Sequence, residues 1–332
     1  MPAMRQTAQA VTPRTKPISL LSVVVPSYNE QEVLREFHGR LSAALSSIQV
    51  RIEIIYVNDG SMDGTLGLIR ELRRQDSRIA IVDLSRNFGK EIALAAGLDH
   101  ARGDAVVILD ADLQDPPELI SEFLEGYRQG YEVVYGQRRT RQGETFLKRA
   151  TAFAFYRVIQ SLTRVWIPQD TGDFRLISRQ TVDSINQLRE QRRFMKGLFA
   201  WVGFPQKAVL YDRSPRFAGR TKWNYWKLWN FALEGITSFS TAPLRAASYI
   251  GITTAAAALV YAAWIVYKTL AFGEPVRGYP SLMVVILFLG GVQLTTIGIL
   301  GEYLGRVFDE TKRRPLYFVK EFEPAVYPDV AG

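Results

Sequence analysis

Short apolar runs alternate with amphipathic segments through the first half of the chain. The runs LLSVVVPSY, IEIIYVN, IAIVDLS, AVVIL and YEVVYG are continuous and apolar, as buried strands are. After the first run, apolar residues recur at helical spacing: Val33, Phe37, Leu41 and Leu45. Parallel neighbouring strands need a crossover connection, so this alternation predicts an α/β fold with a mostly parallel, Rossmann-like sheet and helices on both faces.

Two longer apolar runs follow in the C-terminal part of the chain. No charged residue occurs from Ala246 to Tyr267 or from Gly278 to Gly301. Each run reaches the roughly 20 residues that a helix needs to cross a bilayer. We therefore expect two transmembrane helices at about 246–267 and 279–301. A buried helical hairpin in a soluble protein is the alternative, although core helices are rarely apolar all round for such a length.

These runs divide the chain into five expected segments. They are a flexible basic N-terminal arm (1–18), an α/β domain (19–222), an interfacial amphipathic segment (223–243), two transmembrane helices (244–305) and a C-terminal tail (306–332). Trp223, Trp226 and Trp229 recur at three-residue spacing, which suits a helix at the lipid headgroup level. An aromatic core stripe is the alternative. Basic residues flank the outer ends of the two apolar runs, so both termini are expected in the cytoplasm.

Charge and composition restrict the chemistry. Lys+Arg 41 against Asp+Glu 33 gives a formal net charge of +8, which favours an anionic partner: nucleic acid, a phosphorylated substrate or an anionic lipid surface. Nucleic acid is the least favoured of these, because the basic residues cluster around a predicted phosphate site and the membrane flanks. The chain has no Cys and only two His, so disulfides and thiolate metal sites are excluded and any metal should be bound by oxygen.

Polar clusters follow the predicted strands directly. They read PSYNE, NDGS, SRNFGK, DADLQD and GQRRTR. Ligands of open α/β sheets bind outside the carboxyl ends of the strands. A single polar loop is usually only a solvated connection, but five on one edge predict a binding site there.

The acidic cluster after the fourth run has the donors of a hard-metal site. Asp110 and Asp112 lie two positions apart, and Gln114 adds an amide oxygen. Mg²⁺ or Mn²⁺ binds such oxygens and takes its other ligands from water and substrate phosphates. The alternative is a pair of capping carboxylates before the next helix, the role that we expect for Asp115. Neither a GxGxxG fingerprint after the first strand nor a P-loop motif is present.

Five motifs in order carry a resemblance to a known family. VVVPSYNE, YVNDGSMDGT, NFGKEIALAAGLDHARGD, DADLQDPPE and DTGDFRL are similar to motifs of the inverting family-2 glycosyltransferases of GT-A fold. With the two apolar runs, the chain resembles the membrane subgroup that moves a sugar to a polyprenyl phosphate. This subgroup includes bactoprenol glucosyltransferases, undecaprenyl-phosphate aminoarabinose transferases and dolichol-phosphate mannose synthases. The motifs cover about residues 20–223.

The resemblance implies a metal-dependent, inverting hexosyltransferase at the cytoplasmic face of the bacterial inner membrane. Its expected donor is UDP-glucose and its expected acceptor undecaprenyl phosphate; it would also be a homo-oligomer, by resemblance a tetramer. Aminoarabinose, N-acetylhexosamine or mannose from GDP-mannose are alternative sugars. A processive polysaccharide synthase is a rival, but QRRFMKG lacks the Trp of its QxxRW motif. A non-catalytic, membrane-anchored nucleotide-sugar binding module is the remoter rival.

The resemblance also implies a role for individual residues on the donor side. The residues that would hold the nucleotide sugar are Pro26, Tyr28, Glu30, Asp59, Lys90 and Asp110. Asp59 would accept from the uracil imide. The metal would be bound by Asp110, Asp112 and Gln114, and Asp112 would act in catalysis through it.

On the acceptor side, basic residues are expected to bind the lipid phosphate. Arginine matches phosphate oxygens bidentately, and the candidates are Arg138, Arg139, Arg175, Arg216 and Lys222. The alternative for each is a surface charge. The resemblance makes Asp173 the candidate catalytic base and Arg175, beside it, a further candidate catalytic residue. Because a phosphate monoester is already anionic at neutral pH, Asp173 has an alternative role in orienting a sugar hydroxyl or Arg175.

Overall fold

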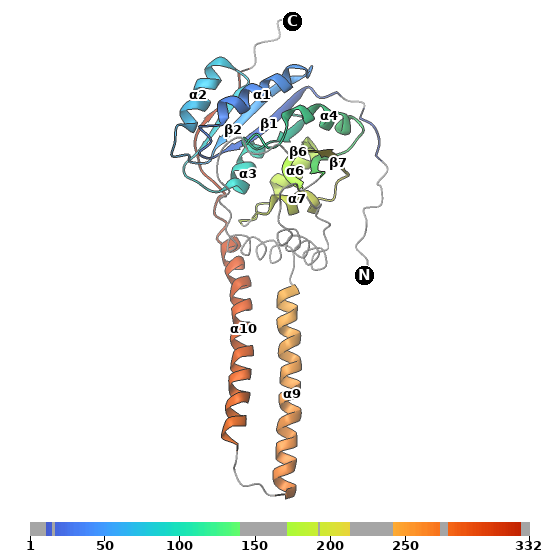
Figure 1. Ribbon diagram of the computed structural model, residues 1–332, viewed down its shortest axis with the longest axis vertical. Coiled ribbons are helices and arrows are strands. Elements are labelled where there is room, and N and C mark those ends of the chain that lie inside the picture. The colour runs from blue at the N-terminus through green and yellow to red at the C-terminus, as the bar shows by residue number, and fades with distance from the viewer. Residues whose placement is uncertain are drawn as a thin grey trace. The chain divides into compact units, whose positions relative to one another are not determined.

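The computed structural model describes residues 11–14, 17–139, 171–191, 193–212, 242–272 and 278–326 (Figure 1). The chain forms two compact units. One comprises Met1–Gly235 together with Pro315–Gly332, and the other is Ile236–Arg314. Each is described by itself below.

The described part of the first unit contains an eight-stranded sheet. The strand order is β7-β5-β6-β4-β1-β2-β3-β8. The strands are β1 (Leu20–Ser27), β2 (Arg51–Asn58), β3 (Ile79–Leu84), β4 (Ala105–Ile108), β5 (Val133–Arg138), β6 (Thr171–Ser178), β7 (Gln206–Tyr211) and β8 (Val319–Glu323). β1 pairs in parallel with both β2 and β4, and β2 pairs in parallel with β3. The predicted GT-A-type, mostly parallel sheet is confirmed.

β6 is the strand that interrupts the parallel order. It lies between β4 and β5 and runs antiparallel to both, with Arg175 opposite Ile108 and Tyr135. β4 and β5 therefore point the same way, and the amino end of β6 lies at the edge where their carboxyl ends lie. This reversal brings the DTGDFRL segment to the predicted binding edge.

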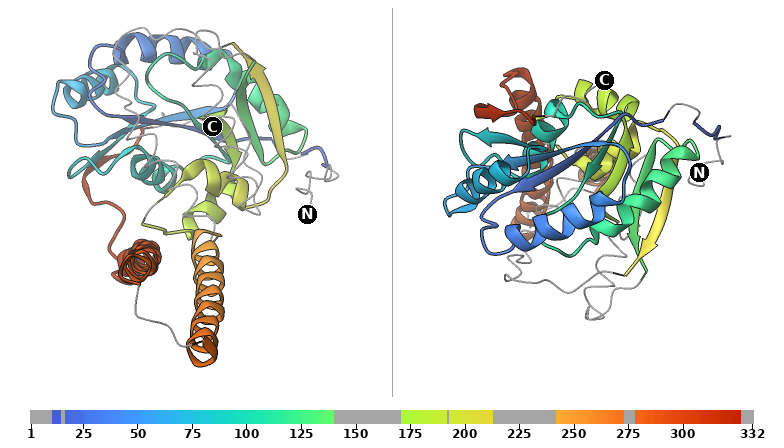
Figure 2. Two further views of the ribbon diagram at one scale, coloured as in Figure 1. Left: turned by 60° about the horizontal axis from the view of Figure 1, so that its bottom comes forward. Right: turned by 90° about the horizontal axis from the view of Figure 1, so that it is seen from above.

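Helices cover both faces of the sheet. The helices of the first unit are α1 (Leu34–Ser46), α2 (Thr65–Gln75), α3 (Lys90–His100), the short η1 (Pro117–Leu119), α4 (Ile120–Arg128), α6 (Arg179–Gln187) and α7 (Met195–Trp201). Leu21, Val23 and Val25 of β1 belong to one core cluster with buried residues of α1, α2 and α4. Gly97 of α3 packs against Val24 on the opposite face. In the left view of Figure 2, the blue helices α1 and α2 lie on one side of the sheet and the teal and yellow-green helices on the other.

The C-terminal tail contributes the last strand of this sheet. β8 pairs antiparallel with β3 and covers its edge. The sequence segment YFVKEFE combines aromatic and β-branched residues, which favour strands, with charged residues, which are common on edge strands. The sequence predicts only a C-terminal tail there, because the segment follows the apolar runs and is far from the other strands in sequence; the structure shows that it contains β8.

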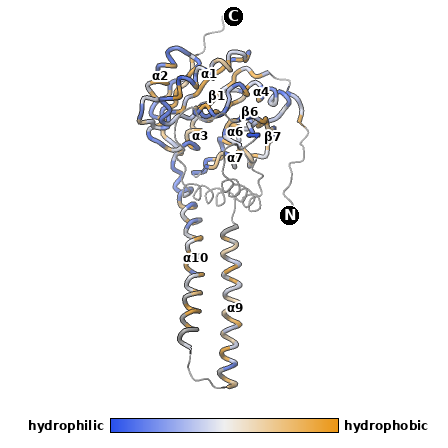
Figure 3. Tube along the Cα trace, viewed as in Figure 1, coloured by the Kyte–Doolittle hydropathy of each residue, from blue (hydrophilic) through white to orange (hydrophobic). Residues whose placement is uncertain are grey.

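The second unit contains two long helices, α9 (Ala242–Phe272) and α10 (Tyr279–Thr311). They include Ala246–Phe272 and Val284–Thr311, which are long and apolar enough to cross a membrane. Apolar residues are spread along both helices in Figure 3. α10 continues past its apolar part, where Arg306 pairs with Glu302 one turn earlier.

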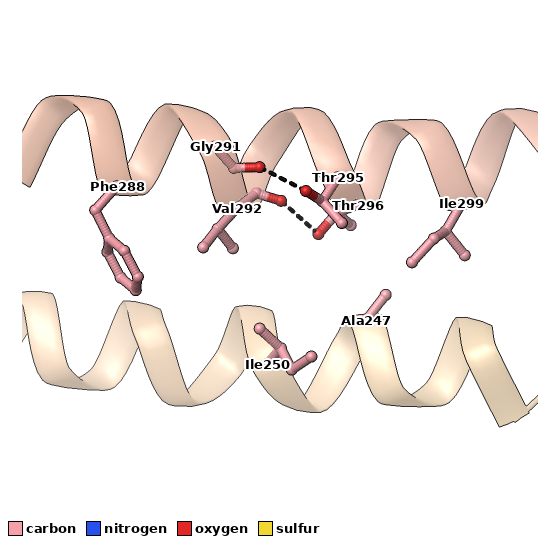
Figure 4. A pocket seen from close by; sticks show the side chains of 8 residues that line it. All are labelled: Ala247, Ile250, Phe288, Gly291, Val292, Thr295, Thr296 and Ile299. Carbon is pink, nitrogen blue, oxygen red and sulfur yellow. Dashed lines mark hydrogen bonds between the residues drawn. The ribbon is translucent and has the colours of Figure 1, made fainter.

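An apolar groove lies between α9 and α10. It is lined by Ala247, Ile250, Phe288, Gly291, Val292, Thr295, Thr296 and Ile299 (Figure 4). The Thr295 and Thr296 hydroxyls donate to the Gly291 and Val292 carbonyls of their own helix, at 2.8 and 2.9 Å. The threonines therefore satisfy their polar groups within α10.

Part of the expected N-terminal arm is described. Arg14 lies 2.6 Å from Glu132 through its Nη2 atom, and its guanidinium stacks over the Tyr127 ring at 4.1 Å. The expected interfacial segment at 223–243 lies outside the described residues, apart from the first two residues of α9.

Candidate functional site

The first two carboxyl-edge loops are hydrogen-bonded to each other. The Asp59 amide donates to the Ser27 carbonyl at 3.0 Å, and the Met62 amide donates to the Asn29 side chain at 2.9 Å. Asn29 has φ 54°, a conformation that asparagine tolerates better than most residues. Pro26 lies in β1, and Tyr28 beyond it is 38% exposed. The loop contacts thus hold the predicted nucleoside-binding segments together.

Asp59 also binds the Ser85–Lys90 loop, which follows β3. Its two carboxylate oxygens accept from the Phe88 and Gly89 amides at 2.7 and 2.9 Å. Gly60 stands next to it at φ +63°, and a Cβ there would lie 2.4 Å from the backbone of Arg86. Burial raises the pKa of the Asp59 carboxyl, more than the two amides lower it. Asp59 is a buried anchor of this edge, and its predicted contact with uracil would use the remaining lone pairs.

Lys90 joins two acidic residues that are far apart in sequence. Its Nζ lies 2.6 Å from Asp110 Oδ2 and also donates to Asp173 Oδ2. Lys90 comes from the start of α3, Asp110 from the segment after β4 and Asp173 from the amino end of β6. The structure thus brings together three of the predicted site residues. Asp173 is 6% exposed, and its Oδ1 atom is buried without a hydrogen-bond partner among the described residues.

The charges of this cluster are strongly coupled. Burial alone would raise the pKa of the Asp173 carboxyl, but the ammonium of Lys90, with Lys196 and Arg175, outweighs burial and holds that pKa well below its usual range. Burial would lower the pKa of Lys90, and the Asp110 and Asp173 carboxylates raise it instead. Asp173 is therefore a firmly ionised carboxylate and, as such, a weak proton acceptor.

Glu91 is a member of this cluster that the sequence did not reveal. It accepts from the Met195 amide at 2.9 Å, at the start of α7. Burial, together with repulsion from Asp173, raises the pKa of Glu91 to about 7. A glutamate in the first turn of α3 reads as an ordinary helix-start residue, so its contact with α7 was not predictable from the local sequence.

The predicted metal ligands Asp110, Asp112 and Gln114 lie in one loop after β4. Asp110 and Asp112 are both partly exposed, and Asp112 Oδ1 accepts from the Gln114 amide at 3.1 Å. Gln114 is 7% exposed. Among the described residues, no group of three His, Cys, Asp or Glu side chains could hold a metal. Two carboxylates suit Mg²⁺ or Mn²⁺, which commonly take one or two protein carboxylates and complete their shell with phosphates and water.

Arg175 lies beneath the site rather than on its surface. It is 4% exposed, its Nη2 donates to the Gly172 carbonyl at 2.9 Å, and its guanidinium stacks over Phe199 at 3.9 Å. Burial lowers the pKa of Arg175 to about 10, although Asp173 opposes the shift. Arg175 therefore braces the strand end that carries Asp173, and its predicted phosphate contact stays a prediction.

The other predicted phosphate-binding residues fall into two groups. Arg138 is partly buried at the end of β5, and Arg139 follows as an exposed residue. A Cβ on Gly172 would lie 3.5 Å from Arg138 Nη2, so Arg138 stands beside the start of β6. Arg216 and Lys222 lie outside the described residues.

Asp115 has a different partner from the one expected. It is 2% exposed and accepts a hydrogen bond from the Tyr211 hydroxyl of β7. The helical turn after it has no side-chain cap. Asp115 therefore ties the acidic loop to β7, and the expectation that it caps the next helix is wrong, because a long-range partner outcompeted the local amides.

Comparisons with known proteins cover almost the whole chain. Residues 22–185 match the model of "Glycosyl transferase family 2", and residues 242–307 match that of the "GtrB C-terminal hairpin". An uncharacterized glycosyltransferase of Synechocystis sp. (sll0501) is 56% identical over 301 residues, which are 91% of this chain and 95% of that protein. The bactoprenol glucosyl transferase of Shigella phage SfV is 48% identical over 300 residues, which are 90% of this chain and 98% of that protein. The solved structure of glucosyl-3-phosphoglycerate synthase from Mycobacterium tuberculosis is 23% identical, covers 66% of this chain and 78% of its own and gives a TM-score of 0.45.

Proposed function

This chain belongs to glycosyl transferase family 2, and from that premise we propose that it transfers one hexose to a polyprenyl phosphate. The donor is a nucleotide sugar, UDP-glucose in the first instance, and the acceptor is undecaprenyl phosphate at the cytoplasmic membrane face. The relative from Shigella phage SfV carries the name bactoprenol glucosyl transferase at 48% identity. The two apolar helices α9 and α10 suit an enzyme whose acceptor is a membrane lipid.

One observation supports this proposal most directly. Lys90 contacts Asp110 and Asp173 at the sheet edge where the PSYNE and NDGS loops also meet. A nucleotide sugar needs a polar pocket for its base, positive charge beside its diphosphate and a polar group near its sugar. The two loops would form the pocket for the base. Asp110 and Asp112 would hold a metal ion beside the diphosphate, Lys90 would add a second positive charge there, and Asp173 would lie near the sugar.

The proposed reaction is inverting. A lipid phosphate oxygen attacks C1 of the sugar, the C1–O bond to the diphosphate breaks, and the nucleoside diphosphate leaves with the bonding electrons. A phosphate monoester has its second pKa at about 6 and is largely dianionic at neutral pH, so the nucleophile requires no protein base. Asp173, ionised and 6% exposed, would orient a sugar hydroxyl through its Oδ1 atom, which has no hydrogen-bond partner within the described part of the chain. Arg138 and Arg139, with Arg216 and Lys222, would bind the acceptor phosphate.

Asp110 and Asp112 would hold Mg²⁺ or Mn²⁺, with Gln114 as a weaker third donor because it is 7% exposed. When bound, the metal supplies charge neutralisation for the leaving diphosphate. Lys90 would add a second positive charge on the same side of the site. Lys90, Asp110 and Asp112 would thus bind the donor and orient it.

The test is a transfer assay on the purified full-length protein with undecaprenyl phosphate. A panel of labelled UDP-glucose, UDP-N-acetylglucosamine, UDP-aminoarabinose and GDP-mannose would be supplied with Mg²⁺ or Mn²⁺. We expect one labelled sugar per lipid, with UDP-glucose as the best donor. A growing polymer would contradict single transfer, another preferred donor would replace glucose, and binding of the nucleotide sugars without transfer to lipid would indicate a binding module. The product's anomeric configuration, compared with that of the donor, tests inversion.

A further inference from the structure

The segment Pro315–Val326, here called the C-terminal strap, returns to the α/β unit after the two long helices and adds β8 to its sheet. We propose that the C-terminal strap is a positioning element of the donor site, which holds the Ser85–Lys90 loop and helix α3 so that Lys90 meets Asp110 and Asp173. This inference rests on the proposed function of that site. The alternative is a purely structural role, in which the strap only covers a sheet edge and stabilises the fold.

The first contact is made at the loop that carries Lys90. β8 pairs with β3 up to Leu84, opposite Val319, with an irregularity in the register before it. The Ser85 amide then donates to the Phe318 carbonyl at 2.9 Å. Without the strap, β3 would be an edge strand with unpaired backbone groups along this side. The strap therefore fixes the point from which the Ser85–Lys90 loop departs.

The second contact is made at the far end of α3. The Tyr317 hydroxyl donates to Asp99 Oδ2 at 2.7 Å, and Arg189 of the segment after α6 binds the same carboxylate at 2.7 and 2.8 Å. The Phe322 ring packs on His100 with ring centroids 4.7 Å apart. Asp99 and Lys90 belong to one short helix. Because a helix of this length moves as a rigid rod, holding its C-terminal turn also sets where its first residue lies.

The third contact reaches a second donor loop. Lys320 Nζ lies 4.0 Å from Asp83 Oδ2, and Asp83 Oδ1 accepts from the Asn58 side chain at 2.7 Å. Asn58 is the first residue of the NDGS loop, and its Oδ1 accepts from the Ser61 amide at 3.3 Å. Asp83 is buried, so its contact with Asn58 is shielded from water. The strap thus contacts the Ser85–Lys90 loop directly and the NDGS loop through Asp83.

The remaining anchors of the strap lie away from the donor loops. Glu323 pairs with Arg70 and Arg73 of α2, and the Pro324 carbonyl accepts from Arg73 at 2.8 Å. These side chains are partly exposed, and such ion pairs stabilise a protein by only about 0–1 kcal/mol. Glu323 therefore offers a matched control, since its loss loosens the strap without touching α3 or the Ser85–Lys90 loop.

The experiment compares Tyr317→Phe with Glu323→Gln in the full-length protein. For each variant, calorimetry gives the Kd for UDP, kinetics give the KM for the sugar donor, the KM for undecaprenyl phosphate and kcat, and a melting curve gives the Tm. We expect Tyr317→Phe to raise the donor KM and the Kd for UDP by about three- to tenfold, which is less than the full contribution of a hydrogen bond to a charged group, because the lost contact acts on the donor site only through α3. Its acceptor KM should stay within about twofold of wild type. Glu323→Gln should leave all three constants within about twofold.

A deletion of the strap with rescue extends the test. A chain that ends at Arg314 should lose donor affinity more strongly, and a peptide of residues 315–326 added in trans should restore it by strand addition. Two outcomes would overturn the inference, whether or not the deleted chain folds. One is a donor KM of Tyr317→Phe within about twofold of wild type. The other is an equal effect of Tyr317→Phe and Glu323→Gln on the donor constants. A wild-type protein that neither binds UDP nor transfers sugar would instead contradict the proposed function.

Discussion

Lys90 is the residue at which the charges of the candidate site meet. Its ammonium contacts Asp110 and Asp173, and it lies in the same loop and helix start whose amides bind Asp59. Its effect on the pKa of Asp173 decides whether that carboxylate acts as a general base or only orients a sugar hydroxyl or Arg175. A general base works best with a pKa near the operating pH, whereas Lys90 holds the pKa of Asp173 well below its usual range even though burial alone would raise it.

The first prediction concerns these two roles. We expect Asp173→Asn to lower kcat by about tenfold or less, because the acceptor phosphate needs no base and Asn keeps an oxygen for orientation. Asp112→Asn should abolish transfer, because it removes a metal-binding carboxylate. Initial rates from pH 6 to 8 would measure both. Loss of the roughly 10²–10⁴-fold that general-base catalysis contributes, with a changed pH profile, would restore Asp173 as the base.

The second prediction concerns Glu91 and the pH dependence of stability. Burial raises the pKa of Glu91 from 4.5 to about 7, so between these pH values the folded protein binds a proton that the unfolded chain has released. The free energy of unfolding therefore falls as pH rises through this window. Glu91→Gln removes the titrating group, so the Tm of wild type should drop relative to that of the variant between pH 5 and 8. An unchanged difference across that range would show that Glu91 is charged throughout.

At the scale of elements, α3 and β6 assemble the site. β6 runs antiparallel between β4 and β5, which delivers Asp173 from its amino end to the edge that the parallel strands reach with their carboxyl ends. α3 delivers Lys90 because it packs closely on the sheet. That closeness depends on Gly97, where a Cβ would lie 2.2 Å from Val24 Cγ1 and 3.1 Å from Val57 Cγ2.

The third prediction tests this packing. Gly97→Ala should destabilise the protein by about 1–3 kcal/mol, because the clash with a stiff, buried valine exceeds the gain of about 1 kcal/mol in helix propensity. Gly67→Ala on α2 is the matched control, since no described atom beyond its chain neighbours and the backbone of its own helix lies within 4 Å of its Cβ position. It should stabilise by about 0.5–1 kcal/mol. Denaturant unfolding measures both, and a stabilising Gly97→Ala would show that α3 can move away from the sheet at little cost.

At the scale of the whole molecule, the chain leaves the α/β unit, passes through α9 and α10, and re-enters the same unit at β8. If both helices cross the bilayer, this connectivity requires the start of α9 and the end of α10 to lie on the same side of the membrane. It agrees with the charge pattern: Lys312, Arg313 and Arg314 follow α10. We propose that this side is the cytoplasm, following the rule that basic residues stay inside.

The fourth prediction concerns this topology. The chain has no cysteine, so a maleimide that labels a single-cysteine variant of it must have reacted at the introduced position. We expect a membrane-impermeant maleimide to label Glu274→Cys, between the two helices, in intact cells. Gln49→Cys, on the exposed surface of the α/β unit, should be labelled only after lysis or in inverted vesicles. Labelling of both positions from one side would contradict two membrane spans.

The sequence by itself determined the first five strands, the two long helices and the chemistry of the binding edge, because these depend on local patterns. Continuous apolar runs gave the five parallel-type strands, uncharged runs gave α9 and α10, and polar clusters after the strands marked the binding edge. Asp110 and Asp112 were found in this way, because they follow the fourth apolar run, whereas the resemblance to family-2 glycosyltransferases pointed to Lys90 and Asp173.

Only the tertiary structure decided which distant residues meet, because such contacts depend on strand order and direction. The antiparallel direction of β6 places Asp173 next to Lys90. Asp115 accepts a hydrogen bond from Tyr211 of β7, whereas its local sequence predicts a helix cap. The pairing of β8 with β3 linked Tyr317 to Asp99 across 218 positions of sequence. No local pattern encodes these pairings, since they follow from burying two faces and one edge of a shared sheet.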